Sequence, residues 1–164
     1  MTWVRPDAVA RSVHDVDYGS LLARGVQAVL FDLENTLCPW RAWELDDRTW
    51  RLLDALLEQG FRLAVVTNAR LPAGHPLVVA LGRRGVPVVD AAQKPFRKGI
   101  RRALDLLGIA PGRAAVVGDQ LLTDVLGARR AGLLAVLVDP LGREESLPTK
   151  FNRGIERLLG RPQP

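Results

Sequence analysis

Carboxylate, amide, hydroxyl and ammonium groups follow several apolar runs of this sequence. The segment VLFDLENTLCPW (29–40) begins with apolar residues and then presents Asp32 and Glu34, two carboxylates separated by one residue. Similar changes from apolar to polar residues occur later in the chain, at Thr67, Asn68, Lys94, Asp119 and Asp124. A buried polar group needs a partner, so these positions are candidates for a site that binds a charged ligand.

Phosphoryl transfer through an aspartyl-phosphate uses this set of groups. Hydrolysis of a phosphate monoester is among the slowest uncatalysed reactions in water, and a carboxylate nucleophile divides it into two easier steps. Asp32 is the predicted nucleophile. Because Asp32 and a phosphate dianion repel each other, we expect Mg²⁺ to bridge them together with Asp119. The ammonium of Lys94 should neutralise the remaining charge.

The neighbouring polar residues fit the other tasks of this reaction. We predict that the hydroxyl of Thr67 and an N–H group of Asn68 hold the phosphate oxygens. Residues i and i+2 of an extended segment point to the same side, so Glu34 should lie on the leaving-group side of the phosphate. There Glu34 would protonate the departing oxygen and then activate the hydrolytic water.

Five apolar runs alternate with helical patterns, and each run is predicted to be a buried strand. The predicted strands are 28–31, 61–66, 86–89, 113–118 and 133–138. The predicted helices are 46–60, 75–85, 95–108, 121–132 and a last amphipathic segment at 150–160. Asp46 is the predicted N-cap of the first helix. This alternation indicates an α/β domain whose parallel sheet is covered on both faces and binds ligands at the carboxyl ends of its strands.

The order and spacing of these residues resemble the haloacid dehalogenase (HAD) superfamily of phosphatases. Its four motifs are matched by FDLENTL, VVTNAR, QKP and VGDQLLTD, which together span residues 31–124. The stretch RPDAVARSVHDVDYGSLLARGVQAVLFDLENTL and the closing PTKFNRGIERLL are similar to the YqeG-type branch, in subfamily IIIA. This branch is related to phosphatidylglycerophosphate phosphatases. The resemblance covers nearly the whole chain.

The resemblance implies a Rossmann-like fold of three layers, with a five-stranded parallel sheet in the order 5-4-1-2-3. In that order the strands that precede Asp32 and Asp119 are neighbours. It also implies that Asp119 is a metal ligand, that Glu34 offers its backbone carbonyl to the metal, and that Asp124 binds through water or supports the other ligands. Glu34 departs from the family pattern, which has Asp there. The added methylene changes the reach of the acid–base group but not of the carbonyl, and we expect a working enzyme.

Length and composition predict a single domain of 164 residues. Its expected parts are a helical lead-in (1–27), a catalytic core (28–138) and a C-terminal loop and helix (139–164). The segments between the motifs are too short for a cap domain, so the site should be open. Cys38 is the one cysteine, and we interpret it as a packed side chain. The sequence shows neither a membrane-spanning run nor a signal peptide, which predicts a cytoplasmic protein.

An open site suits a phosphate on a bulky molecule, and by the resemblance phosphatidylglycerophosphate is the leading candidate. The net charge of +5 comes from 20 Arg and 3 Lys against 18 acidic residues, and favours anionic partners. Trp40 and Trp43 either form an aromatic rim at the inner membrane surface or pack against the following helix, and the sequence leaves both open. A specific nucleic-acid partner is not expected, and the oligomeric state is not indicated.

Three alternatives make different demands on the sequence. A two-component receiver domain needs its phosphorylated Asp after the third strand and its Lys after the fifth, so the position of Lys94 excludes it. A module that binds Mg²⁺ and phosphate but has lost turnover through Glu34 stays open. So does a basic protein that binds membrane or nucleic-acid surfaces, for which binding should fall steeply with salt and hydrolysis should be absent.

Overall fold

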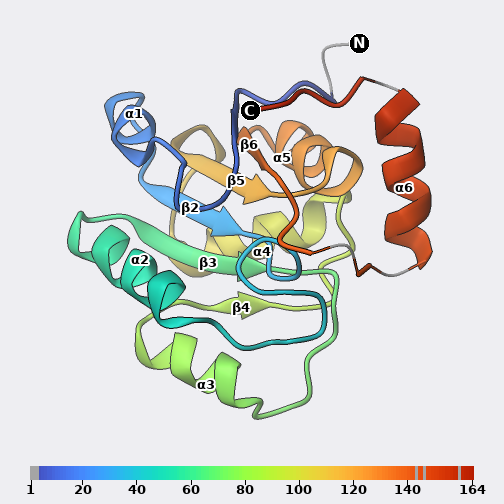
Figure 1. The fold of residues 1–164 in the computed structure, drawn as a ribbon. Coiled ribbons are helices and arrows are strands. Elements are labelled where there is room, and N and C mark those ends of the chain that lie inside the picture. The colour runs from blue at the N-terminus through green and yellow to red at the C-terminus, as the bar shows by residue number, and fades with distance from the viewer. Residues whose placement is uncertain (1–3, 143, 146, 159) are drawn as a thin grey trace.

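The fold is built on a six-stranded, wholly parallel sheet, seen in a computed structural model that describes residues 4–142, 144–145, 147–158 and 160–164 (Figure 1). The strands are β1 (Ala8–Ala10), β2 (Ala28–Phe31), β3 (Arg62–Val66), β4 (Val88–Val89), β5 (Ala114–Gly118) and β6 (Leu134–Val138). The α-helices are α1 (Tyr18–Ala23), α2 (Asp47–Glu58), α3 (Pro76–Arg83), α4 (Arg97–Leu107), α5 (Leu126–Ala131) and α6 (Leu147–Leu158). A 3₁₀ turn (Pro111–Arg113) precedes β5, and a π-helical turn (Leu121–Val125) precedes α5.

Alternate residues of each strand face two separate apolar cores. In β2, Val29 and Phe31 pack in the cluster that contains the buried residues of α1, α2 and α3. Ala28 and Leu30 pack in the second cluster, with the buried residues of α4 and α5. Because both faces of the sheet are covered, the central strands are apolar at every position, and the protein has the three layers of a Rossmann-like α/β fold (Figure 1).

The predicted strand count of five is wrong. The order in space is β1-β6-β5-β2-β3-β4, so the five predicted strands keep their expected relative order, 5-4-1-2-3, and β1 adds a sixth strand beside β6. The predicted helical lead-in therefore contains a strand as well as α1. Strand β1 has only three residues, which show too little periodicity for a strand to be predicted from the sequence. Asp7 holds this edge, because its N–H donates to Ala135 O at 2.7 Å and its carboxylate accepts from Ala135 N at 2.8 Å.

The register of the central strands brings three loops to one edge of the sheet. Phe31 of β2 lies beside Val65 of β3 and Val117 of β5. The residues that follow these positions leave the sheet together at its carboxyl edge. The polar residues that follow the strands in the sequence are therefore neighbours in space.

Helix α6 lies apart from both helical layers, at the carboxyl edge of the sheet (Figure 1). Its nearest packing is against the π-helical turn that precedes α5. Within the described residues, every helix is too short or too polar to cross a bilayer.

Candidate active site

Asp32 and Asp119 follow the neighbouring strands β2 and β5. The N–H of Asp32 donates to Val117 O at 2.9 Å, which extends the pairing of these strands by one residue. The hydroxyl of Thr36 lies 3.2 Å from Asp119 Oδ1 and 3.5 Å from Asp32 Oδ2, so it contacts both carboxylates. Both aspartates are buried, Asp119 completely. The topology thus places two distant carboxylates side by side.

Lys94 brings a buried positive charge to this cluster. Its Nζ lies 2.6 Å from Asp32 Oδ1 and 2.6 Å from Asp124 Oδ1. Only 2% of the Lys94 side chain is exposed, so these ion pairs are shielded from solvent. A compact ammonium with three donors suits a position shared by two acids and open to a further oxygen ligand.

Asp124 belongs to the π-helical turn, which turns its carboxylate back towards the end of β5. Asp124 Oδ2 accepts from Gln120 N at 3.1 Å, while Oδ1 faces Lys94. The described carboxylates that could hold a metal ion together are those of Asp32, Asp119 and Asp124, whose ligand oxygens lie within 4.8 Å of one another.

Burial and mutual repulsion shape the protonation of these groups. Burial raises the pKa of Asp32 to about 6, with Lys94 opposing the shift and Asp124 adding to it. Burial, and then the charges of Asp32 and Asp124, raise the pKa of Asp119 well above its ordinary value. Burial opposes the charge of Lys94, but the two carboxylates outweigh it and raise its pKa. Burial therefore disfavours the charged carboxylates, and a further cation beside them would favour their ionised forms.

Thr67 and Asn68 follow β3 and lie beside Lys94. The amide of Asn68 clamps the backbone of Lys94: its Oδ1 accepts from Lys94 N at 2.7 Å and its Nδ2 donates to Lys94 O at 3.0 Å. The Thr67 hydroxyl accepts from Ala69 N at 3.1 Å. The side chain of Asn68 thus positions the lysine loop, which leaves its backbone N–H as the group available to a phosphate.

The carboxylate of Glu34 is hydrogen-bonded within the loop that follows β2. Its Oε1 accepts from Arg41 N and from Trp43 Nε1, each at 3.0 Å. The loop bends sharply to make these bonds, since both Arg41 and Trp43 have positive φ, at 59° and 44°. Trp43 packs against the apolar core and meets the ring of His75 edge-on at 5.7 Å, which favours the packing interpretation over a membrane rim for this residue.

A cavity of about 300 Å³ opens above the cluster. The predicted catalytic residues all line it: Asp32, Glu34, Thr67, Asn68 and Lys94. Trp40 lines it as well, and α6 borders it through Pro148, Thr149 and Asn152. Asp119 and Asp124 lie behind this lining, fully buried. The C-terminal helix thus forms part of the wall of a site that the sequence predicts to be open.

Arg153 of α6 is a site residue that the sequence analysis did not single out. Its Nη2 contacts the carboxylate of Asp119, its Nη1 donates to Asp119 O at 3.0 Å, and its Nε contacts the carboxylate of Glu145. Burial opposes the charge of Arg153, but Asp119 and Glu145 raise its pKa. The sequence feature that could have indicated Arg153 is its spacing from Glu156, because residues i and i+3 share one face of a helix and can form an ion pair there.

Glu156 anchors α6 and is fully buried. Its Oε1 accepts from Leu121 N at 2.7 Å and from Leu122 N at 3.3 Å, in the turn that carries Asp124. Arg161 bonds its Oε2 at 2.9 Å and also donates to Asp119 O at 2.8 Å. The helix is therefore held by its polar face.

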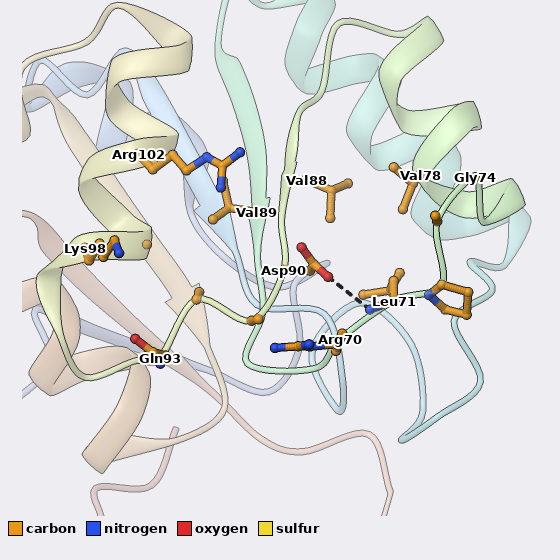
Figure 2. A pocket seen from close by; sticks show the side chains of 15 residues that line it. Arg70, Leu71, Gly74, Val78, Val88, Val89, Asp90, Gln93, Lys98 and Arg102 are labelled. Atoms are coloured by element: carbon orange, nitrogen blue, oxygen red, sulfur yellow. Dashed lines mark hydrogen bonds between the residues drawn. The ribbon is translucent and has the colours of Figure 1, made fainter.

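A larger cavity, of about 680 Å³, lies between the loops after β3 and β4 and helix α4 (Figure 2). Arg70, Lys98 and Arg102 line it, and its Asp90 carboxylate accepts from Leu71 N at 3.2 Å. The predicted site residues do not line this cavity. Since its lining has cations but no carboxylate cluster, the chemistry is assigned to the smaller cavity.

The donor set fits Mg²⁺. This hard cation prefers oxygen ligands, and three buried carboxylates offer them at the carboxyl edge of the sheet. Burial raises the pKa of both Asp32 and Asp119 and so disfavours their charged forms, and a cation bound between them would offset this effect.

Solved structures share this fold. A HAD-superfamily hydrolase from Ehrlichia chaffeensis superimposes with a TM-score of 0.54 and 16% identity, over 84% of this chain and 99% of the other. CbbY from Rhodobacter sphaeroides, in complex with phosphate, superimposes with a TM-score of 0.53 and 20% identity, over 74% of this chain and 90% of CbbY. These similarities define the fold of the chain, a Rossmann-like α/β fold with carboxylates at the carboxyl ends of its central strands.

Comparison of the sequence with known proteins identifies the family of the chain. A family model described as HAD-hydrolase-like matches residues 91–145. Probable phosphatase YqeG of Bacillus subtilis is 31% identical over 154 residues, which cover 94% of this chain and 88% of YqeG. The chloroplastic phosphatidylglycerophosphate phosphatase 1 of Chlamydomonas reinhardtii is 30% identical over 142 residues, covering 83% of this chain and 53% of the algal protein. The chain therefore belongs to the HAD phosphatases, in the YqeG family.

Proposed function

We propose that this phosphatase is a Mg²⁺-dependent phosphomonoesterase that works through an aspartyl-phosphate on Asp32. The observation that supports the proposal most is the position of Lys94, whose Nζ lies 2.6 Å from both Asp32 and Asp124 beside Asp119. A buried ammonium in this position holds Asp32 in the ionised form that a nucleophile requires, although burial alone favours the protonated acid.

In the first step an Oδ atom of Asp32 forms a bond to phosphorus while the bond from phosphorus to the ester oxygen breaks. Lys94 offsets the charge on the phosphate, and the Thr67 hydroxyl and the Asn68 backbone N–H hold its equatorial oxygens. Protonated Glu34 gives its proton to the departing oxygen, so the leaving group departs as an alcohol.

In the second step a water molecule attacks the aspartyl-phosphate. Glu34 takes a proton from this water, the new bond to phosphorus forms, and the bond between phosphorus and Asp32 breaks. Inorganic phosphate leaves and the carboxylate is restored. Both hydrogen bonds to Glu34 go to Oε1, and we assign the proton transfers to Oε2.

When bound, Mg²⁺ would be held by Asp32, Asp119 and the backbone carbonyl of Glu34, with Asp124 in support, and would offset the negative charge of the phosphate. Thr36, which bonds both Asp32 and Asp119, orients these two carboxylates. Asn68 fixes the backbone of Lys94 and therefore its reach.

The proposed substrate is a phosphate on a lipid, with phosphatidylglycerophosphate the leading candidate. The similarity to the algal phosphatidylglycerophosphate phosphatase and the basic net charge support it. We further propose one HAD-like domain without a cap, with residues 28–138 as the catalytic core and 139–164 as the segment that borders the site. The protein would act in the cytoplasm at the inner membrane surface.

Hydrolysis assays test this function. Wild-type protein should release phosphate from an aryl phosphate and from phosphatidylglycerophosphate in detergent, and chelation of Mg²⁺ should abolish both activities. The lipid should give the higher kcat/KM. Equal turnover with Mg²⁺ and with excess chelator would contradict the proposed metal dependence.

A second candidate is a module that binds Mg²⁺ and phosphate without turnover. The hydrogen bonds from Trp43 and Arg41 N, which hold Glu34 in the loop, favour it. An inactive wild type whose activity appears on Glu34→Asp substitution would identify this module. A third candidate is a basic protein that binds membrane or nucleic-acid surfaces. Its binding should fall steeply with salt, and neither the wild type nor the Glu34→Asp variant should hydrolyse a phosphate ester.

A further inference from the structure

Helix α6 has its apolar face in solvent. Leu147, Phe151 and Leu158 are exposed to 80%, 71% and 88%. At about 100° per residue these positions lie within a sector of about 40°, so they form a single apolar stripe along the helix. The opposite face carries Glu156 and Arg153, which bind the turn after β5 and Asp119.

The charges of α6 are divided between its two faces. Lys150 and Arg157 are exposed and lie on one flank of the stripe, whereas Glu156 is buried. The charged residues that the described helix shows to solvent beside the stripe are therefore cationic. An apolar stripe with a cationic flank is the pattern of helices that lie in the interface of a membrane.

We propose that the stripe of Leu147, Phe151 and Leu158 docks the protein on a bilayer that contains acidic phospholipids. The occupant follows from charge: acidic headgroups complement Lys150 and Arg157, and the net charge of the chain is +5. A second copy of the chain would instead bring the same cationic flank against the first.

The position of the helix gives this docking a consequence for catalysis, and that part rests on the proposed function. Pro148, Thr149 and Asn152 of α6 line the cavity above Asp32. One helix therefore carries both the docking stripe and a wall of the site. A docked helix holds the cavity at the level of the headgroups, where a lipid phosphate lies.

Co-sedimentation with vesicles tests the proposal. Wild-type protein should bind vesicles of equal parts phosphatidylcholine and phosphatidylglycerol, and bind pure phosphatidylcholine weakly. The triple variant Leu147→Ser, Phe151→Ser, Leu158→Ser should lose at least about tenfold in binding to the acidic vesicles. The double variant Lys150→Glu, Arg157→Glu should lose a similar factor in binding to the acidic vesicles, and its binding to pure phosphatidylcholine should not change.

The matched control makes the same change at apolar residues exposed elsewhere: Leu22, Val79 and Leu106, which are 48%, 43% and 58% exposed. This control should bind like the wild type. The proposal would be overturned if the wild-type protein did not bind acidic vesicles, or if the stripe variant bound them as well as the control does. A wild-type dimer, measured by light scattering, that the stripe substitutions convert to monomer would also overturn it.

Turnover of a soluble aryl phosphate separates the docking from the proposed function. The stripe variant should hydrolyse it at the wild-type rate while its rate on vesicle-borne lipid phosphate falls. If wild type and stripe variant both fail on the soluble substrate but differ in vesicle binding as expected, the docking surface stands and the proposed catalysis fails.

Discussion

Gly118 lies directly against the carboxyl group of Asp124. A Cβ at position 118 would fall 2.3 Å from Asp124 Cγ and 2.4 Å from its Oδ2. Gly118 ends β5 immediately before Asp119, so the chain can turn Asp124 towards Lys94 only because residue 118 has no side chain. The geometry of the cluster thus depends on a residue without any functional group.

Gly118→Ala should displace Asp124 and weaken both the pair with Lys94 and the binding of Mg²⁺. We expect kcat/KM to fall by about 10²-fold, since displacements near 1 Å in a catalytic site have effects of this size. Isothermal titration with Mg²⁺ should show weaker binding in parallel. Gly112→Ala is the control, because a Cβ there meets no atom within 4 Å. Equal losses in the two variants would contradict this role of Gly118.

Arg153 supplies a counter-charge to the buried carboxylate of Asp119, and its removal should destabilise the metal-free protein. The side chain of Arg153 is 13% exposed and that of Asp119 is 0% exposed, and breaking a buried ion pair costs about 3 kcal/mol. Urea unfolding of Arg153→Met in the presence of chelator should show this loss. Saturating Mg²⁺ should recover part of it by giving Asp119 another positive charge. Arg157→Met, on the exposed side of α6, is the control, and equal stability of the two variants would count against the pair.

Glu34→Asp should keep or raise turnover. The shorter side chain should lose the hydrogen bonds from Trp43 Nε1 and Arg41 N, which hold Glu34 Oε1 in the wild type, and its carboxylate is then free to turn towards the phosphate. Glu34→Ala should lower kcat by about 10²- to 10⁴-fold, the usual contribution of general acid–base catalysis. Steady-state assays on an aryl phosphate measure both. Full activity in Glu34→Ala would remove Glu34 from the mechanism.

The thiol of Cys38 should be unreactive in the folded protein. Its side chain is buried, with 1% exposure, and burial raises its pKa to about 11. Because the thiolate is the reactive form, iodoacetamide at pH 8 should label Cys38 only after unfolding in urea. Mass spectrometry of the two samples reads the difference directly. Rapid labelling under native conditions would show that the loop around Cys38 opens.

Strands buried on both faces could be predicted from the sequence because they need continuous apolar residues. The predicted strand 28–31 coincides with β2, and Asp46 is confirmed as the N-cap of α2 by its 2.7 Å bond from Thr49 N. Strand β1 could not be predicted in this way. Its three residues owe their conformation to pairing with β6, far along the chain, rather than to any local pattern.

The meeting of Asp32 and Asp119 could be predicted from the strand order, but the contact of Arg153 with Asp119 could not. Once β2 and β5 are neighbours, Asp32 and Asp119 must meet at the carboxyl edge. The contact of Arg153 with Asp119 depends instead on which face of α6 turns inward. That face is the polar one, against the usual expectation for an amphipathic helix, because buried Glu156 holds it by hydrogen bonds.

The most direct test of the account is whether phosphate becomes covalently attached to residue 32. Wild type and Asp32→Asn are mixed with an aryl phosphate and Mg²⁺, quenched in acid, reduced with borohydride, and analysed by mass spectrometry. An aspartyl-phosphate, reduced to homoserine, should appear at position 32 of the wild type, and Asp32→Asn should lose turnover by more than about 10³-fold. Turnover that survives in Asp32→Asn would contradict this covalent mechanism.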